Sequence, residues 1–291
     1  MLNRGGAARW WQGARPRTLP ASVVPVVVGS AVAIHGGQFV WYLAGLALVV
    51  AVAMQIGVNY ANDYSDGVRG TDANRVGPAR LVAGGRATPA EVKRAALACF
   101  GVSAVAGTVL SALSDPRLLI VGALSIAAAW FYTGGSKPYG YSGFGEPAVF
   151  IFFGLVATVG TFYAQTGTVS TAVVASGSAI GLLSVALLVA NNLRDLSTDA
   201  SSGKRTMAVR LGDHNTRVLY ALSTLLPFVV VLFLVLLKPS VILALAALAF
   251  AVPPVRSVLG GATGHGLIEV LAATGKLQLG FGALLAVGWV V

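Results

Sequence analysis

The chain has 291 residues, of which 56% are hydrophobic and only 10% are charged. An average soluble protein has about 25% charged residues, so 20 Lys and Arg and 10 Asp and Glu side chains are too few to cover a globule in water. The composition excludes a soluble domain and predicts an integral membrane protein. The formal net charge of +10 does not favour nucleic acid as a partner, because basic residues of membrane proteins gather in cytoplasmic loops.

A helix needs roughly 20 apolar residues to cross a hydrocarbon core about 30 Å thick, and nine largely uncharged runs near this length follow one another. They cover residues 18–35, 39–62, 95–113, 118–135, 147–165, 171–191, 218–237, 239–255 and 267–291. The last run contains Glu269 and Lys276, whose charges are costly in lipid unless they face protein or the interface. We predict one transmembrane domain over residues 1–291, an all-α bundle of about nine helices, with residues 1–17 as a cytoplasmic N-terminal segment.

The basic residues indicate the orientation of the bundle through the positive-inside rule. With the N-terminus inside, only Arg117 and Lys238 fall in outer connections and Lys276 in the last span, while every other one of the 20 Lys and Arg residues lies in an inner segment. The inner loops, residues 63–94, 134–146 and 192–217, are also the long ones. We therefore expect the chemistry at the cytoplasmic face and the C-terminus outside.

Most of the carboxylates lie in two of the inner loops. Those after the second span are Asp63, Asp66 and Asp72, and those after the sixth span are Asp195, Asp199 and Asp213. On a helix at 100° per residue, Asn59, Asp63 and Asp66 fall within about 60° of one another. Asn191, Asp195 and Asp199 likewise fall within about 80°. The matching pattern favours two facing polar helix ends, as in a bundle with a weak internal repeat.

Acidic side chains that face one another in a partly desolvated mouth repel, which implies a counter-charge between them. Mg²⁺ takes oxygen ligands and is typically held by one or two carboxylates together with substrate phosphates. The bases that follow the two acidic groups are Arg69, Arg75, Arg80 and Arg86 after the first, and Lys204 and Arg205 after the second. Acids and bases together favour a metal-bridged diphosphate. The alternative interpretation is that these Asn and Asp residues cap helix ends or are merely solvated.

The middle inner loop, residues 130–146, is rich in glycine, which permits close approach of the backbone to a ligand. Its aromatic residues include Tyr132, Tyr139 and Tyr141, whose flat faces suit an aromatic acceptor. Lys137 is the only basic residue of this loop and is expected to reach a phosphate. The alternative is an interfacial aromatic belt, which membrane proteins carry routinely.

These motifs resemble those of the UbiA-type intramembrane aromatic prenyltransferases, most closely the 1,4-dihydroxy-2-naphthoate polyprenyltransferase (MenA) branch. The segments that carry the resemblance are Asn59-x-x-Asn62-Asp63-Tyr64-x-Asp66-Gly67, Tyr132-Thr-x-Gly135-x-x-Pro138-Tyr139-Gly140-Tyr141-x-Gly143-x-Gly145-Glu146, and Asn191-Asn192-Leu193-Arg194-Asp195-x-x-x-Asp199 with Gly203-Lys204-x-Thr206. The resemblance implies a UbiA-like bundle around a central cavity. The chain departs from the superfamily at two points, because Lys137 follows Tyr132 by five positions instead of four and the last acid of the first motif is Asp66 instead of position 67.

The resemblance also implies roles for single residues. The implied ligands of Mg²⁺, directly or through water, are Asp63, Asp66, Asp195 and Asp199, supported by Asn59 and Asn191. The residues that would stabilise the departing diphosphate are Lys137, Lys204 and Arg205. The further substrate-binding residues are Asn62, Tyr132, Tyr139, Tyr141 and Arg194. For the carboxylate of the acceptor, Arg194 and Lys137 are the two candidates.

The implied reaction transfers a polyprenyl group from polyprenyl diphosphate to 1,4-dihydroxy-2-naphthoate in a bacterial cell membrane. Ionisation of the donor gives an allylic cation, the electron-rich ring attacks it at the carboxylate-bearing carbon, and loss of CO₂ restores aromaticity to give a demethylmenaquinone. One alternative keeps the superfamily and changes the acceptor, for example to 4-hydroxybenzoate. Another, from a different class, is a cation-coupled transporter, which would carry its acids at mid-span. The expected partners are the two substrates and membrane lipid, without nucleic acid.

Overall fold

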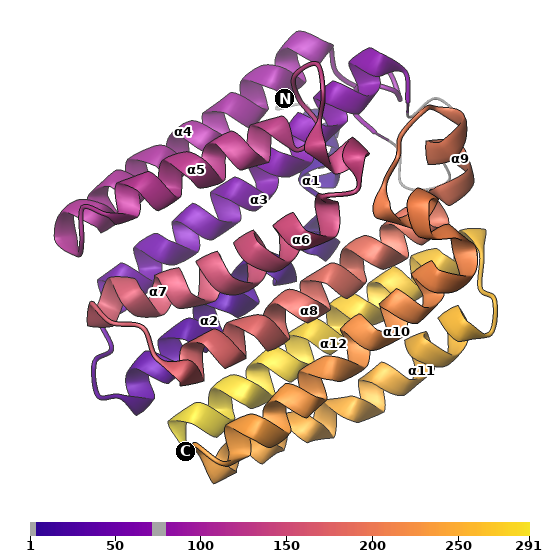
Figure 1. Ribbon diagram of the computed structural model, residues 1–291. Coiled ribbons are helices and arrows are strands. Elements are labelled where there is room, and N and C mark those ends of the chain that lie inside the picture. The colour runs from indigo at the N-terminus through magenta and orange to yellow at the C-terminus, as the bar shows by residue number, and fades with distance from the viewer. Residues whose placement is uncertain (1–3, 72–79) are drawn as a thin grey trace.

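The computed structural model describes residues 4–71 and 80–291, and no strand occurs among them. Long helices lie side by side in one elongated bundle (Figure 1). Within the described residues, seven helices are long and apolar enough to cross a membrane, and an eighth span results if the bent pair Gly6–Thr18 and Pro20–His35 is taken together. The predicted all-α membrane bundle is confirmed, and its helix count roughly matches the nine spans expected.

The elements follow the chain in a simple order. They are α1 (Arg4–Ala14), η1 (Pro16–Thr18), α2 (Pro20–His35), α3 (Trp41–Arg69), α4 (Pro89–Leu113), α5 (Leu118–Phe131), η2 (Tyr139–Ser142), α6 (Gly145–Val149), η3 (Phe150–Val156), α7 (Ala157–Thr166), α8 (Thr171–Arg194), α9 (Leu196–Ser201), α10 (Met207–Val235), η4 (Pro239–Ala247), α11 (Leu248–Leu259) and α12 (Gly264–Val290). η3 is a π-helical segment, and the other η elements are 3₁₀ helices.

Each predicted span has a counterpart, but several boundaries differ. α3 continues past the predicted end at residue 62 to Arg69, because its Asn and Asp residues remain helical until Gly70 adopts a left-handed conformation with φ 71°. α5, with 14 residues, is shorter than the predicted span 118–135. The predicted division at residues 165–170 is confirmed, since Gly167 ends α7 with φ 68° and the Ser170 side chain caps α8 by accepting a hydrogen bond from the Val173 N–H.

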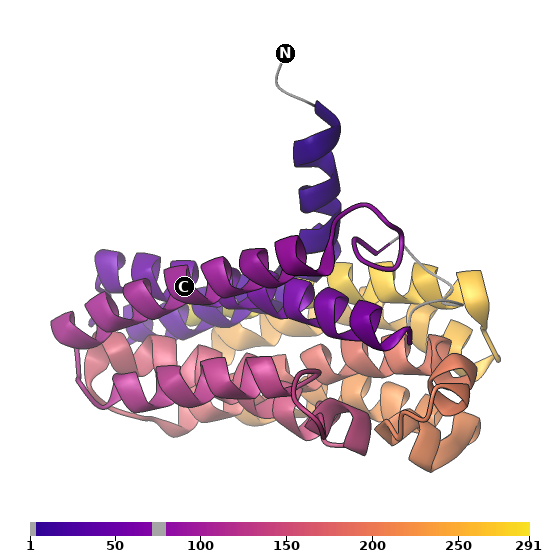
Figure 2. The same cartoon turned by 90° about the horizontal axis from the view of Figure 1, so that it is seen from above.

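Buried apolar side chains join the helices in separate groups. One group joins α1, α3, α4 and α5, and another joins α2, α7, α8, α10 and α12. α1 stands out from the side of the bundle (Figure 2). It is held there by Tyr60 of α3, whose hydroxyl donates to the Trp10 carbonyl oxygen at 2.9 Å and whose ring meets the Trp10 ring edge to face. The N-terminal segment is thus anchored to α3.

The π-helical segment η3 packs directly on α8 through glycines. A Cβ added at Gly154 would lie 2.4 Å from the Gly181 Cα and 2.7 Å from the Gly177 carbonyl oxygen. The lack of side chains lets the two helix backbones touch, as small residues do in membrane helix pairs.

Gly154→Ala is expected to destabilise the protein by about 1–3 kcal/mol, because the added methyl group forces η3 and α8 apart. Gly160→Ala in α7 is the matched control, since nothing lies within 4 Å of the Cβ it would add. Thermal unfolding in detergent, followed by size-exclusion chromatography, measures both. Equal melting temperatures for the two variants would contradict the close contact.

Candidate active site

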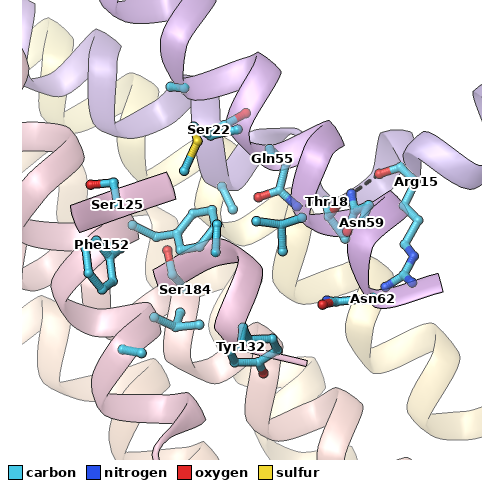
Figure 3. Close-up of a pocket in the computed structure, with 18 of the residues that line it drawn as sticks. Arg15, Thr18, Ser22, Gln55, Asn59, Asn62, Ser125, Tyr132, Phe152 and Ser184 are labelled. Carbon is cyan, nitrogen blue, oxygen red and sulfur yellow. Dashed lines mark hydrogen bonds between the residues drawn. The ribbon is translucent and has the colours of Figure 1, made fainter. Parts of the chain in front are cut away.

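A cavity of about 990 Å³ lies among the helices that carry the predicted motifs. In Figure 3, Phe152 and Ser125 lie on one side of it, and Arg15, Asn59 and Asn62 lie on the other. Away from the acidic motifs its wall consists largely of apolar and small side chains, which include Val50, Ala51, Met54, Phe152, Phe153 and Leu187. The cavity therefore has one strongly polar part and one part suited to a hydrocarbon chain.

The two aspartates of the first motif lie on α3 and are buried, with exposed fractions of 1% for Asp63 and 5% for Asp66. The Asp63 carboxylate accepts hydrogen bonds from the backbone N–H groups of Leu81 at 2.8 Å and Val82 at 3.0 Å. This carboxylate holds the backbone of Leu81 and Val82 against α3. Asp66 instead meets side chains, and its Oδ1 accepts hydrogen bonds from the hydroxyl of Tyr141 and, at 3.2 Å, from that of Thr71.

The second motif surrounds the end of α8. Asp195 and Arg194 form an ion pair in which the guanidinium donates to both carboxylate oxygens at 2.7 Å. Arg194 also donates to the Asn191 side-chain oxygen at 2.6 Å. Asp199 lies one turn further, on α9, and like Asp195 it is buried and lines the cavity. Asn191, Arg194, Asp195 and Asp199 are thus brought together as predicted.

Lys204 joins the two motifs. Its ammonium nitrogen lies 3.1 Å from the Asp66 Oδ1 and 3.6 Å from the Asp199 Oδ1. It also lies 4.7 Å from the centroid of the Tyr141 ring, above its face. One buried cation therefore offsets the repulsion between carboxylates that come from opposite halves of the chain.

The aromatic loop closes this end of the cavity, and Tyr132, Tyr139 and Tyr141 all contribute to its wall. Arg69 of α3 fixes the loop by donating to the carbonyl oxygens of Thr133 and Gly135, and the Thr133 hydroxyl donates to the Asn62 side chain at 2.8 Å. Burial raises the pKa of Tyr139 to about 12. Burial, followed by the charge of Asp66, also raises the pKa of Tyr141. Tyr139 and Tyr141 stay protonated and donate hydrogen bonds, Tyr139 to the Ala128 carbonyl oxygen at 2.8 Å and Tyr141 to the Asp66 carboxylate.

Two of the predicted basic residues lie elsewhere. Lys137 and Arg205 are exposed, and neither is among the described residues that line the cavity. The side chains of the neighbours Lys204 and Arg205 differ, since Lys204 is buried and lines the cavity and Arg205 is exposed. The backbone N–H of Arg205 donates to the Tyr141 carbonyl oxygen at 2.8 Å, and the backbone N–H of Lys204 donates to the Asp199 carbonyl oxygen at 3.0 Å. Asp72 and Arg75, which the sequence also placed near the site, fall outside the described residues.

The structure adds residues to the site beyond those whose roles the resemblance implies. Arg80 lines the cavity, and its guanidinium lies 3.8 Å from the Asp66 carboxylate. Glu146 is buried and accepts a hydrogen bond from the Asn192 side chain at 2.9 Å. Thr18 and Arg15, between α1 and α2, also line the cavity. The signal for Glu146 and Asn192 was their place inside the motifs, whereas Arg15 and Thr18 had none because they precede the motifs by more than 40 residues.

The arrangement suits a metal held partly by substrate. Among residues 4–71 and 80–291, no group of three His, Cys, Asp or Glu side chains could hold a metal ion on its own. Two carboxylates that converge from different helices, with Lys204 and Arg80 beside them, offer oxygen ligands for a divalent cation and positive charge for phosphate oxygens. The residues present therefore fit a divalent metal bound together with a diphosphate.

Tyr141→Phe is expected to lower kcat/KM for a diphosphate donor by about tenfold, because one hydrogen bond to a buried carboxylate is lost while the ring beneath Lys204 stays. Tyr141→Ala removes the ring as well and is expected to have a larger effect. Steady-state kinetics with the donor as the varied substrate measures both. Identical kinetics for Tyr141→Phe and the unmodified protein would show that the hydroxyl does not orient Asp66 for the reaction.

The helical membrane bundle encloses a cavity with a polar part, where the acidic motifs converge, and an apolar part. These features define an intramembrane enzyme that binds a lipid diphosphate. The UbiA prenyltransferase family model matches residues 22–261. The chain belongs to the UbiA prenyltransferase family.

Two relatives in this family carry the same name. The chain is 52% identical to 1,4-dihydroxy-2-naphthoate octaprenyltransferase of Mycobacterium tuberculosis over 94% of this chain and 93% of that one. It is 41% identical to the protein of the same name from Escherichia coli over 73% of this chain and 71% of that one. Both alignments extend over most of the two chains.

Solved structures of UbiA homologues share the fold. The apo structure of a homologue from Aeropyrum pernix K1 superposes with a TM-score of 0.72 at 16% identity, covering 94% of this chain and 98% of that one. A homologue from Archaeoglobus fulgidus bound to DMAPP and Mg²⁺ gives a TM-score of 0.60 at 14% identity, covering 96% and 99%. These likenesses confirm the UbiA-like bundle expected from the sequence.

Proposed function

We propose that this protein transfers a polyprenyl group from a polyprenyl diphosphate to 1,4-dihydroxy-2-naphthoate, with release of diphosphate and CO₂. The product is a demethylmenaquinone, so the protein acts in menaquinone biosynthesis. The observation that carries the proposal is the meeting of Asp66 and Asp199 at Lys204 inside a cavity with a large apolar part. The 52% identity to a 1,4-dihydroxy-2-naphthoate octaprenyltransferase supports this acceptor.

We infer that Asp66 and Asp199 hold Mg²⁺ together with the donor diphosphate, with Asp63 and Asp195 as further ligands, directly or through water. When bound, Mg²⁺ supplies positive charge that stabilises the leaving diphosphate. Lys204 and Arg80 take the remaining phosphate oxygens, and Tyr141 keeps the Asp66 carboxylate in place. Asp63 and Asp195 already accept hydrogen bonds from Leu81, Val82 and Arg194, so their main contribution is to fix the two walls.

The remainder of the cavity guides the reacting groups. The apolar wall receives the start of the isoprenoid chain and keeps water from the allylic cation, which would otherwise be hydrolysed. Loss of CO₂ restores the aromatic ring after attack at the carboxylate-bearing carbon.

Purified protein in detergent tests the proposal with carboxyl-labelled naphthoate, a polyprenyl diphosphate and Mg²⁺. We expect labelled CO₂ to be released in step with prenylated product, and EDTA to stop both. A prenylated product that still carries the labelled carboxylate would contradict the proposed reaction. Full activity in EDTA would contradict the proposed metal.

We further propose that the single transmembrane domain is oriented with the N-terminus and the site at the cytoplasmic face of a bacterial membrane, and the C-terminus outside. Lys137 is exposed beside the site, and Cys99 is the single cysteine. With Cys99 replaced by Ser, Lys137→Cys in intact cells should resist a membrane-impermeant maleimide that labels Lys238→Cys. The reverse labelling pattern would overturn this orientation.

A further inference from the structure

We propose that Glu146 orients the side chain of Asn192 so that its amide oxygen accepts a hydrogen bond from a hydroxyl group of the aromatic acceptor. The inference rests on the proposed function in so far as the acceptor is a dihydroxynaphthoate. It gives the acid at the beginning of α6 a positioning role, and it assigns recognition of the hydroxyl group to Asn192 of α8.

Glu146 is a buried acid behind the wall of the cavity. It is 4% exposed, and its Oε1 accepts a hydrogen bond from the side-chain nitrogen of Asn192 at 2.9 Å. Its Oε2 is buried and has no hydrogen-bond partner among the described residues. Glu146 is not one of the residues that line the cavity, whereas Asn192 is. An unpaired buried carboxylate oxygen is costly and calls for an explanation in the site beside it.

The hydrogen bond to Glu146 decides which end of the Asn192 amide faces the cavity. An amide oxygen cannot donate a hydrogen bond to a carboxylate, so the nitrogen is the end that faces Glu146. The Asn192 oxygen has no hydrogen-bond partner within residues 4–71 and 80–291, and it is not among the buried atoms that lack one. The wall at Asn192 therefore presents an accessible hydrogen-bond acceptor to the cavity.

This acceptor lies on the side of the cavity that the aromatic loop forms. At Gly145, an added Cβ would lie 3.2 Å from the Tyr132 hydroxyl oxygen and 3.3 Å from Leu188 of α8. The lack of a side chain at Gly145 lets Tyr132 and α8 meet beside Glu146. Tyr132 and Leu188 line the cavity together with Asn192, and Figure 3 shows Tyr132 at this wall. An aromatic ring and a hydrogen-bond acceptor are thus close together.

Of the two substrates, the aromatic one carries the groups that can donate to this oxygen. An ionised polyprenyl diphosphate consists of accepting oxygens and a hydrocarbon chain, whereas 1,4-dihydroxy-2-naphthoate has two hydroxyl groups. The 1-hydroxyl stands beside the carboxylate and donates to it within the molecule, so the 4-hydroxyl is left for the protein. The metal is expected elsewhere, where Asp66 and Asp199 meet at Lys204. The Asn192 oxygen therefore fits the 4-hydroxyl.

Direct binding to the purified protein, without donor or Mg²⁺, tests the assignment. The probes are 1,4-dihydroxy-2-naphthoate, kept reduced under anaerobic conditions, and 1-hydroxy-2-naphthoate, which lacks the 4-hydroxyl. The ratio of their dissociation constants is the preference for that hydroxyl. We expect a preference of about tenfold in the unmodified protein, the size of one hydrogen bond, and its loss in Asn192→Leu.

Exchange of the two functional groups separates positioning from packing. Glu146→Gln keeps the size of the side chain, but its amide nitrogen donates to the Asn192 oxygen and turns that oxygen away from the cavity, so the preference should fall below about threefold. Adding Asn192→Asp returns the charge to the pair, with the donor now on α6 and an accepting oxygen again at the cavity. This double variant should regain the full preference. Glu91→Gln, the same change in the capping box of α4 and outside the cavity, should retain it.

An undiminished preference in Asn192→Leu or Glu146→Gln would overturn the assignment, as would equal binding of the two probes to the unmodified protein. A double variant that melts like the unmodified protein but lacks the preference would overturn the positioning role of Glu146. Prenyl transfer to 1,4-dihydroxy-2-naphthoate is measured separately. Its absence alongside a preference that depends on Glu146 would count against the proposed function alone, and transfer alongside a preference independent of Glu146 would count against this inference alone.

Discussion

Asp66→Asn and Asp199→Asn are each expected to reduce the initial rate of prenyl transfer by about 10²–10³-fold, the loss typical of removing one fixed electrostatic group from a reacting site. The physical reason is their convergence, since both carboxylates contact one ammonium nitrogen although they come from different halves of the chain. Asparagine keeps the size of each side chain and removes the negative charge that would hold the metal on the diphosphate. The measurement is the initial rate of product formation at saturating Mg²⁺.

Glu269→Gln is the control for this pair. Glu269 is an exposed acid at the beginning of α12, and its ion-pair partner is His265 at 3.7 Å. The same change of charge there should leave the rate within about twofold, because exposed ion pairs contribute little. A rate for Asp66→Asn or Asp199→Asn as high as that of Glu269→Gln would remove these carboxylates from the reaction.

Lys204→Met is expected to lower kcat by about 10²–10³-fold, because it removes a cation placed for the leaving diphosphate. It has a second effect in the metal-free protein, where Asp66 and Asp199 lose the ammonium group between them. Two buried carboxylates without that counter-charge repel each other, so the variant should melt at a lower temperature than the unmodified protein. Added Mg²⁺ should then raise its melting temperature more than it raises that of the unmodified protein.

Lys137→Met provides the comparison, since this lysine was predicted to serve the same diphosphate and is exposed in the structure. We expect kcat to fall by less than about threefold and the melting temperature to be unchanged, as for most surface substitutions. Thermal shift with and without Mg²⁺, followed by kinetics, measures both variants. A larger loss for Lys137→Met than for Lys204→Met would reverse the roles assigned to the two lysines.

The fold was largely predictable because insertion into lipid depends on runs of apolar residues, which composition records directly. The boundaries near the site were less predictable. Charged residues usually mark the end of a span, yet α3 continues to Arg69 because the neighbours of Asp63 and Asp66 supply hydrogen bonds to their carboxylates. The π-helical segment η3 was not expected, and its backbone touches that of α8 at Gly181, which lies far from it in the sequence.

The acidic motifs of the site were predictable from helical spacing, and the structure places Asp66 and Asp199 within reach of one cation. The orientation of the loop bases was not predictable. Lys204 and Arg205 are adjacent, and the backbone at this point is held by one hydrogen bond from Arg205 to the distant Tyr141 and by one from Lys204 to the nearby Asp199. Asn59 shares a helical face with Asp63 as predicted, but its amide reaches Ala14 and Thr18, a contact that no spacing within α3 indicates.

One competition assay tests the central claim, that this cavity joins a polyprenyl donor to a naphthoate acceptor, most directly. The purified protein receives polyprenyl diphosphate, Mg²⁺ and equal concentrations of 1,4-dihydroxy-2-naphthoate and 4-hydroxybenzoate, and mass spectrometry identifies the products. We predict a decarboxylated prenyl naphthoquinol as the dominant product. Prenylated 4-hydroxybenzoate as the main product, or no prenylated product from either acceptor, would contradict the claim.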